Sequence, residues 1–304
     1  MVYVSIVSCI IFVLLVELCR LSEPRLSKKR PKLATNTTKS VSYRCGSMNI
    51  VPPVDFVQGI KFRLYVISHD EKSHKVATEW VRCKPWATVV QIPTTVFFES
   101  IVYKEVLPPL VKDWEELDFV GIATYRSLKF APMEKMKASL ELAHYKPYDV
   151  MPLYTTGEYM MEQAVSGHTT RFIQVWDNLL RTMGFSDVDI RKGDKAEVFL
   201  RNSILIRPAW LKKLSKFMIS AMDAVQTNST IRNDFITDAH YQEAIYRKAV
   251  AQRVFRTDYY QWHPFIFERL PVFFLNHHNA SVFGTLRETE WFDFANSEQV
   301  FKGL

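Results

Sequence analysis

Glycine is scarce in this chain, with nine residues among 304. The two glycine-rich motifs that commonly bind nucleotides, Gly-x-Gly-x-x-Gly and Gly-x-x-x-x-Gly-Lys-[Ser/Thr], are both absent. Their absence excludes a Rossmann dinucleotide site and a P-loop. A phosphate group bound by this protein must therefore be held by other means.

Cysteine is also scarce, and the four cysteines predict neither a disulfide framework nor a zinc site. Cys9 and Cys19 lie in or beside an apolar N-terminal run, which leaves only Cys45 and Cys83 able to pair. No Cys-x-x-Cys occurs. Cysteine content therefore does not decide whether the protein resides in an oxidising compartment.

Other motifs for metal binding and hydrolysis are missing as well. No His-x-x-x-His pair occurs, and the adjacent His277 and His278 point in different directions on any element. The one Asp-x-Asp, 187–189, follows a Gly-Phe-Ser sequence typical of a turn and helix cap, so we predict that it is surface. Gly-x-Ser-x-Gly is absent. We predict no metal site; a requirement for Mn²⁺ or Mg²⁺ stays possible but unsupported by the sequence.

Positive charge is concentrated near the N-terminus. Residues 1–60 hold eight Lys and Arg against three acids, which is +5 of the net +7. The remaining 244 residues are nearly neutral. This distribution disfavours a basic nucleic-acid-binding body, and we expect no nucleic-acid partner.

The N-terminal sequence predicts a membrane anchor followed by a stalk. Residues 2–16 are an uncharged apolar run, short for a span. A cleaved signal peptide is less favoured, because there is no basic segment before the run and no small-x-small cleavage site after it. We predict an anchor at 1–22 that contacts the membrane through 2–22, a basic, polar stalk at 23–58, and an α/β domain at 59–304.

The orientation of this anchor is predicted differently by two signals. Basic residues in 25–32 follow the apolar run, which favours a cytosolic body by the positive-inside rule and is also typical of contact with anionic lipid. The glycosylation sequons at Asn36, Asn228 and Asn279 have meaning only in a secretory lumen. We expect a single-pass protein of the Golgi or secretory pathway with a lumenal body; a cytosolic-facing body is the alternative.

The body alternates strand-like apolar runs with helical patterns, which predicts an α/β fold with a mostly parallel sheet flanked by helices. In the first turn, Ser68 and Glu71 fit a capping box. Pro152 lacks a backbone N–H, which places its strand at a sheet edge. The predicted strands are 62–67, 88–92, 118–123 and 149–154. The predicted helices are one that starts at the Ser68 cap and runs to about Cys83, one at 96–107 and one opening at Pro132. Apolar stripes in 172–183 and 211–225 are predicted to be core.

Polar clusters follow three of the predicted strands. They are His69-Asp70, 124–127 and 155–158. Ligands of open α/β sheets bind outside the carboxyl ends of the strands, so we expect these clusters to form one site. The first also begins a helix, where free N–H groups favour an anion, and Arg126 offers a permanently charged fork to the same anion.

The segment 259–270 combines aromatic residues with His263, Glu268 and Arg269. Aromatic rings stack on sugars while carboxylates bind their hydroxyls, so this segment fits the wall of a carbohydrate site. The alternative is a packed helix that fixes the C-terminal part onto the core through a Glu268–Arg ion pair.

Four landmarks in order indicate a family. They are the strand 64–70, ending in His69-Asp70, the strand 118–127, with Gly121-Ile122-Ala123-Thr124-Tyr125-Arg126-Ser127, the run 201–206, and Glu268-Arg269-Leu270. Together they resemble the bacterial polysaccharide-cluster glycosyltransferases long catalogued as a domain of unknown function, over residues 61–275. Their motifs are His-Lys at the first strand end, Gly-x-x-His-Tyr-Arg-Arg-Tyr and Glu-Arg-Leu.

The resemblance implies a GT-A-like nucleotide-sugar transferase fold without a metal-binding Asp-x-Asp. The partners would be a nucleotide-sugar donor and a glycan acceptor. Arg126 would stabilise the diphosphate, and Glu268, with His263 as its alternative, would act as general base. The expected donor-binding residues are His69, Asp70, Tyr125, Arg126, Thr155 and Asn202, and the expected acceptor-binding residues are Trp262 and Asp238.

The chain departs from this family at three positions. Thr124 replaces a histidine, Ser127 the second arginine, and Asp70 a lysine. These departures support an alternative hypothesis, a catalytically inactive carbohydrate- or nucleotide-binding protein on the same fold.

Overall fold

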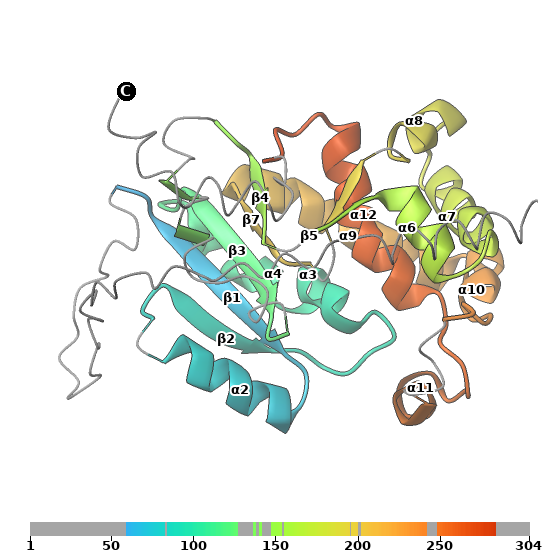
Figure 1. Ribbon diagram of the computed structural model, residues 1–304, viewed down its shortest axis with the longest axis horizontal. Helices are drawn as coiled ribbons and strands as arrows, with labels where there is room; N and C mark the ends of the chain where they lie inside the picture. Colours follow the sequence, from blue (N-terminus) through green and yellow to red (C-terminus); the bar gives the residue numbers. More distant parts are fainter. Residues whose placement is uncertain are drawn as a thin grey trace, which may run out of the picture. The chain divides into compact units, whose positions relative to one another are not determined.

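The described part of the chain is an α/β unit that lies within Met48–Leu304. The computed structural model describes residues 59–82, 84–126, 136–137, 140–141, 147–153, 155–194, 196–199, 202–241 and 248–283, with backbone only at 155–157 and 197 (Figure 1). The predicted anchor and stalk lie outside these residues. Among the helices that the structure describes, none has the length and apolar character to cross a bilayer.

A five-stranded sheet forms the centre of this unit, in the order β2-β1-β3-β7-β4. Its strands are β1 (Phe62–Ser68), β2 (Ala87–Gln91), β3 (Phe119–Thr124), β4 (Val150–Pro152) and β7 (Ile204–Ile206). β1 pairs in parallel with β2 and β3, whereas β7 pairs antiparallel with β3 and β4. The prediction of a mostly parallel sheet is thus confirmed for β1 to β3. It is wrong for β7, whose antiparallel pairing makes the sheet mixed. β4 is an edge strand, as Pro152 predicted.

A second, two-stranded sheet pairs β5 (Thr155–Tyr159) with β6 (Glu197–Phe199) in antiparallel fashion. The sequence prediction ran the strand beginning at 149 through to 154. In the structure β4 ends at Pro152, and the next strand belongs to the other sheet.

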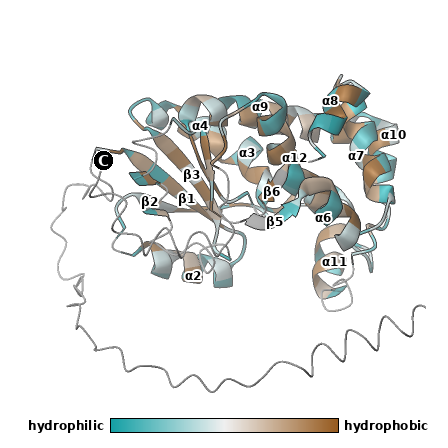
Figure 2. Cartoon of the chain, turned by 45° about the horizontal axis from the view of Figure 1, so that its top comes forward, coloured by the Kyte–Doolittle hydropathy of each residue, from teal (hydrophilic) through white to brown (hydrophobic). Residues whose placement is uncertain are grey.

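Both faces of the main sheet are buried, which explains its continuous apolar strands. Leu64 and Val66 belong to a core beneath α2 (Glu71–Val81), while Tyr65 and Ile67 face the larger core on the helical side. Figure 2 shows the resulting hydrophobic colour along β1 and β3. Gly121 in β3 is fitted between its neighbours, because a Cβ there would lie 2.5 Å from Leu64 Cδ1.

Helix α2 begins two residues later than the predicted cap. Asp70 is its N-cap, and the capping box joins Asp70 and Ser73 rather than Ser68 and Glu71. The reason is that β1 continues through Ser68, whose Oγ lies 3.3 Å from His74 Nδ1. Hydrogen bonds from the backbone and side chain of Ser73 lower the pKa of Asp70.

The single helix predicted at 96–107 is replaced by two short elements, η1 (Phe98–Ile101) and α3 (Val102–Glu105). Two more, α4 (Leu107–Leu110) and η2 (Val111–Trp114), follow beyond its predicted end. Pro108 and Pro109 have no N–H to donate to the preceding turn, so α3 cannot continue through them. Of the helix predicted from Pro132, the structure describes parts only, in which Met136 and Leu140 are buried.

The other side of the molecule is helical. Its helices are α6 (Met160–Gly167), α7 (Arg171–Thr182), α8 (Asp187–Lys192), α9 (Pro208–Thr227), α10 (Ser229–Phe235), α11 (Lys248–Phe255) and α12 (His263–His277). The apolar stripes predicted in α7 and α9 are buried, which confirms their core role. α12 runs against α9 through the centre of this part (Figure 1). The Asp-x-Asp at 187–189 opens α8 behind the cap residue Ser186, as expected for a surface turn.

Candidate functional site

A cavity of about 550 Å³ opens at the carboxyl ends of β1, β2 and β3. The chain passes from β1 to β2 on one side of β1 and then to β3 on the other, so the crevice between β1 and β3 is a topological switch point. Strand ends form one wall, and α6, α11 and α12 contribute the other. This is where the sequence placed its ligand site.

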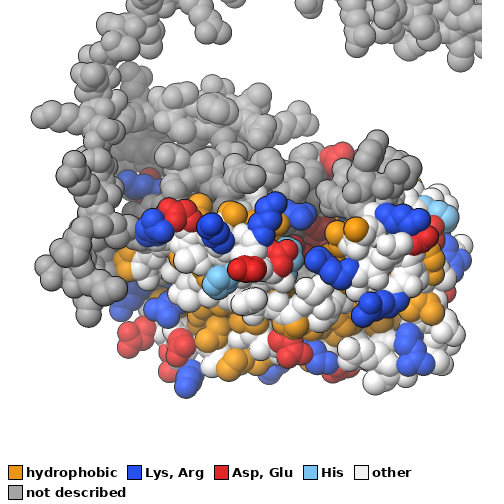
Figure 3. Space-filling model, turned by 90° about the horizontal axis from the view of Figure 1, so that it is seen from below, with side chains coloured by type: hydrophobic (Ala, Val, Ile, Leu, Met, Phe, Trp, Pro, Cys, Tyr) orange, Lys and Arg blue, Asp and Glu red, His pale blue; other side chains and the backbone are white. Residues whose placement is uncertain are grey.

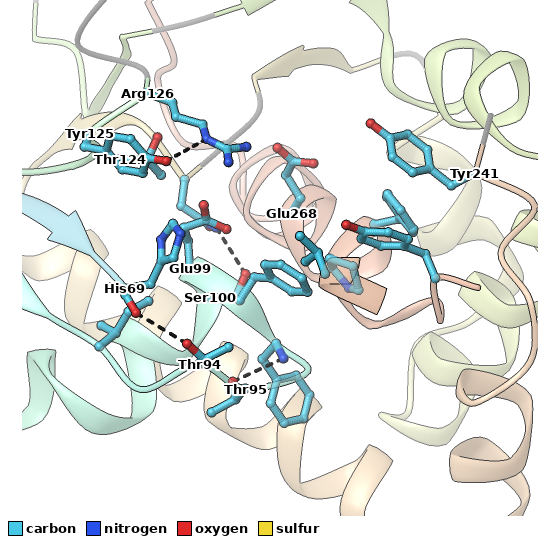
Figure 4. A pocket seen from close by; sticks show the side chains of 18 of the residues that line it. His69, Thr94, Thr95, Glu99, Ser100, Thr124, Tyr125, Arg126, Tyr241 and Glu268 are labelled. Carbon is cyan, nitrogen blue, oxygen red and sulfur yellow. Dashed lines mark hydrogen bonds between the residues drawn. The ribbon is translucent and has the colours of Figure 1, made fainter. Parts of the chain in front are cut away.

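Six of the predicted site residues line this cavity together. They are His69, Asp70, Tyr125, Arg126, Asn202 and Glu268. Residues that directly follow β1 and β3 therefore meet residues from the turn before β7 and from α12. Figure 4 shows His69, Tyr125 and Arg126 on the strand side and Glu268 on the helix side.

The strand wall is organised by Tyr125. Its ring lies 5.5 Å from the His69 ring, between centroids, which joins the ends of β1 and β3. Nε of Arg126 donates a 3.0 Å hydrogen bond to the Tyr125 hydroxyl. That bond leaves the terminal nitrogens of the guanidinium for other partners.

Arg126 remains charged in this setting. Burial lowers its pKa, but the hydrogen bond to Tyr125 and the nearby Glu99 carboxylate outweigh that effect, so the pKa is raised overall. Among the residues that the structure describes, Arg126 has no carboxylate within ion-pair distance. The side chain is thus a permanent cation available to an anionic ligand.

Glu268 projects from α12 into the cavity. In Figure 4 its carboxylate lies between Arg126 and Tyr241. The side chain is half-buried, while its neighbours Phe267 and Arg269 are buried. A carboxylate held on a rigid helix, opposite a cation, has the placement of a general base.

Asn202 lines the cavity, but both ends of its amide are engaged. Nδ2 donates to Ser100 Oγ at 3.1 Å, and Oδ1 accepts from the Tyr103 hydroxyl at 3.3 Å. Its backbone has φ of 48°, in the left-handed region that Asn tolerates better than most residues. Asn202 therefore joins β7 to η1 and α3 and shapes the floor of the cavity.

The structure places His263 and Trp262 in the core, away from the cavity lining. His263 is 5% exposed, and its ring meets Phe97 and Phe235 edge-on. Burial lowers the pKa of His263 to about 4. Trp262 is fully buried and donates to Thr237 Oγ1. Their aromatic packing corresponds to the alternative interpretation of this segment, a helix fixed onto the core, and leaves Glu268 as the candidate base.

The remaining predicted residues are not among the described residues that line the cavity. Asp238 accepts a 2.7 Å hydrogen bond from the His240 backbone and does not line the cavity. Thr155 is in β5, opposite Phe199. Asn228 caps α10 by accepting from two backbone N–H groups, and Asn279 is exposed. Cys45, Cys83, Ser127 and Asn36 lie outside the described residues.

Several lining residues with ionisable side chains were not singled out from the sequence. Lys72, Glu99, His168 and Arg253 come from α2, η1, the residue after α6, and α11. None lies in a motif, and only the fold brings them to the strand ends. Arg269, in contrast, is part of the Glu-Arg-Leu motif but was given no role of its own.

The described residues contain no group of three His, Cys, Asp or Glu side chains arranged to hold a metal ion. Acidic and basic side chains are interspersed on the face shown in Figure 3, which agrees with the near-neutral composition of the body. The positive charge at the cavity therefore comes from single Lys and Arg side chains within a surface of mixed charge.

No protein-family model matches the chain, and no curated protein or solved structure shows significant similarity to it. The functional argument therefore depends on the chemistry of the cavity.

Proposed function

We propose that this protein is a glycosyltransferase that moves a sugar from a nucleotide-diphosphate donor to a glycan acceptor, on a GT-A-like fold. The observation that carries the proposal is the placement of a permanent cation, Arg126, and a helix-borne carboxylate, Glu268, on opposite sides of one cavity at the switch point of the sheet. Sugar transfer needs both groups, one for the leaving diphosphate and one for the attacking hydroxyl.

Arg126 is proposed to bind the diphosphate. As the bond to the sugar breaks, negative charge grows on the departing phosphate oxygen, and a preorganised guanidinium stabilises that charge. The Tyr125 hydroxyl orients the Arg126 side chain through the 3.0 Å hydrogen bond from Nε, so the side chain loses little conformational entropy when a ligand binds. Lys72 and Arg253 also line the cavity and add positive charge.

Asp70 is assigned to a hydroxyl of the donor rather than to its phosphates. Its carboxylate already accepts the Ser73 N–H at the start of α2, so it occupies the position that an anion would take there. A carboxylate binds hydroxyl groups by accepting their hydrogens. His69, beside the Tyr125 ring, completes the wall that faces the nucleoside.

Glu268 is proposed to take the proton from the acceptor hydroxyl as that oxygen attacks the sugar carbon. Proton transfer by a positioned side chain contributes about 10²- to 10⁴-fold to a rate. Transfer would rely on the protein cations, without an Asp-x-Asp metal site.

Thermal unfolding of the full-length protein tests the proposal. A panel of nucleoside diphosphate sugars is added, with and without Mn²⁺, and release of nucleoside diphosphate is measured for any donor that raises the melting temperature. We expect one donor to stabilise the protein and to turn over with a glycan acceptor. If no donor stabilises it, the proposal fails.

Stabilisation without turnover would favour the alternative, an inactive carbohydrate- or nucleotide-binding protein. Thr124, which stands where the resembled family has histidine, is buried at the end of β3 and is the departure that favours this alternative.

A further inference from the structure

The helical end of the cavity holds a buried cation. Arg269 is 2% exposed on α12, lines the cavity, and lies one residue beyond Glu268. Its guanidinium carbon is 5.3 Å from the centre of the Phe172 ring. Burying an arginine is costly unless a negative charge compensates it, so the groups around Arg269 decide what this end of the cavity binds.

Among the described residues, the hydrogen-bond partners of Arg269 are neutral. Nη1 donates to the backbone oxygen of Phe265 at 2.6 Å, Nη2 donates to Gln163 Oε1, and Nε has no partner among the described residues. Burial lowers the pKa of Arg269, and the more distant Glu268 and Glu158 only partly offset this. In the part of the chain that the structure describes, Arg269 therefore has no carboxylate within ion-pair distance.

His168 supplies a neutral acceptor beside this cation. Its Nδ1 lies 3.0 Å from the Ala239 backbone oxygen, and because a carbonyl can only accept, Nδ1 carries the proton. Burial, with Arg269 as the second cause, lowers the pKa of His168 to about 4, so the ring is neutral at pH 7. Nε2 is then an unprotonated acceptor, suited to a hydroxyl hydrogen.

Aromatic rings enclose the same place. The Phe265 ring lies 4.1 Å from His168 and 4.8 Å from Tyr241, between centroids. Such faces stack on the apolar side of a sugar ring. Cation, hydroxyl acceptor and ring faces thus line the same cavity. Tyr241 lies on the side of Glu268 away from Arg126 (Figure 4).

We propose that this end, lined by Gln163, His168, Tyr241 and Arg269, binds an acidic sugar of the acceptor glycan through its carboxylate or phosphate oxygens. That this sugar belongs to the acceptor rests on the proposed function, in which Glu268 lies between the donor and this sugar. The oxyanion neutralises the positive charge of Arg269, and a neighbouring hydroxyl donates a hydrogen bond to His168 Nε2. A neutral sugar satisfies the second contact only.

The test is a ligand-observed NMR titration of the full-length protein with glucuronic acid, glucose 6-phosphate and glucose. We expect an acidic sugar to bind at least tenfold more tightly than glucose, and the two acidic probes distinguish a carboxylate from a phosphate as the preferred group. Equal affinities for all three, or no binding of any, would overturn the proposal.

Two variants and one control separate ligand recognition from folding. Gln163→Glu supplies, from within the chain, the carboxylate that the ligand is expected to bring. It should raise the melting temperature and abolish the preference for acidic sugars, whereas Gln174→Glu, at an exposed position of α7, should change neither. Arg269→Met should remove the preference as well. A Gln163→Glu protein that keeps its preference would contradict the site.

Failure here is distinguishable from failure of the proposed function, because no donor enters the titration. If no nucleotide sugar stabilises the protein but the Arg269-dependent preference is present, the transferase proposal fails and the acidic-sugar site stands. If donors bind and turn over without such a preference, only the site is wrong.

Discussion

Nε of Arg126 donates a 3.0 Å hydrogen bond to the hydroxyl of Tyr125, the residue that precedes it at the end of β3. Adjacent residues in an extended strand point to opposite faces, so this bond is possible only because the chain leaves β3 at Thr124 and turns. The turn aims both side chains into the cavity. It thereby makes a charged guanidinium part of a fixed wall, which is the basis of the proposed diphosphate site.

Glu268→Gln should separate chemistry from donor binding. The amide cannot accept a proton at neutral pH but has the same shape, so we expect the turnover rate to fall by about 10²-fold or more. Donor affinity, measured by calorimetry, should change little. Glu162→Gln, on the exposed side of α6, is the matched control and should keep wild-type turnover. Unchanged turnover in Glu268→Gln would remove it from the mechanism.

Asn202 should matter more for stability than for donor affinity. Asn202→Ala removes the bonds to Ser100 and Tyr103 and places at φ of 48° a residue that tolerates the left-handed region less well than Asn, so the free energy of unfolding should fall by about 2–3 kcal/mol. Asn202→Gly loses the same bonds without the backbone strain and should be about 1 kcal/mol less affected. Urea unfolding measures both. Weakened donor binding at unchanged stability would instead support the role of orienting sugar hydroxyls.

Two buried histidines predict the dependence of stability on acid. His168 and His263 have pKa values near 4 when folded, below the ordinary 6.5, so the unfolded chain binds more protons between these pH values. Stability should therefore be highest above pH 6.5 and should fall toward pH 4, by roughly 3 kcal/mol for each histidine.

Urea unfolding at several pH values checks this dependence. His263→Phe, which also removes a buried Nδ1 without a partner, should roughly halve the slope. His240→Asn, at an exposed position, is the control. A stability curve that is flat between pH 4 and 6.5 would contradict the assignment of neutral, buried rings.

Asn228 provides a test of membrane orientation. If the body is lumenal, expression in a eukaryotic host should add endoglycosidase-sensitive mass at this sequon. Asn228→Asp should lose that mass while still capping α10, because a carboxylate accepts the same backbone N–H groups. A wild-type protein without the added mass would favour the cytosolic-facing alternative.

The strands β1 to β4 were predictable because each is a compact apolar run with polar residues directly after it, whereas β5 and β6 were not predicted. His69 and Arg126 could be assigned to one site on that basis, since parallel strands present their carboxyl ends at one edge. The direction of β7 was not predictable, because three apolar residues, Ile204–Ile206, carry no signal for parallel or antiparallel pairing.

Helix periodicity identified buried faces but not their breaks or their long-range neighbours. Pro108 and Pro109 interrupt the helix predicted before them, and His263 was grouped with Glu268 although one side of α12 packs in the core and the other meets the cavity. Glu99, His168 and Arg253 reach the cavity only through tertiary packing. No local pattern distinguishes such residues from ordinary surface or core positions.

The central claim is that Arg126 binds the diphosphate of a nucleotide sugar at the ends of β1 and β3. The direct measurement is calorimetric titration of the full-length protein with the nucleoside diphosphate of its donor and with the corresponding nucleoside, in wild type, Arg126→Ala and the exposed control Arg82→Ala. We expect the diphosphate to bind at least tenfold more tightly than the nucleoside in wild type and Arg82→Ala, and this difference to vanish in Arg126→Ala. Equal binding of diphosphate and nucleoside by the wild type, or an Arg126→Ala protein that keeps the difference, would contradict the account.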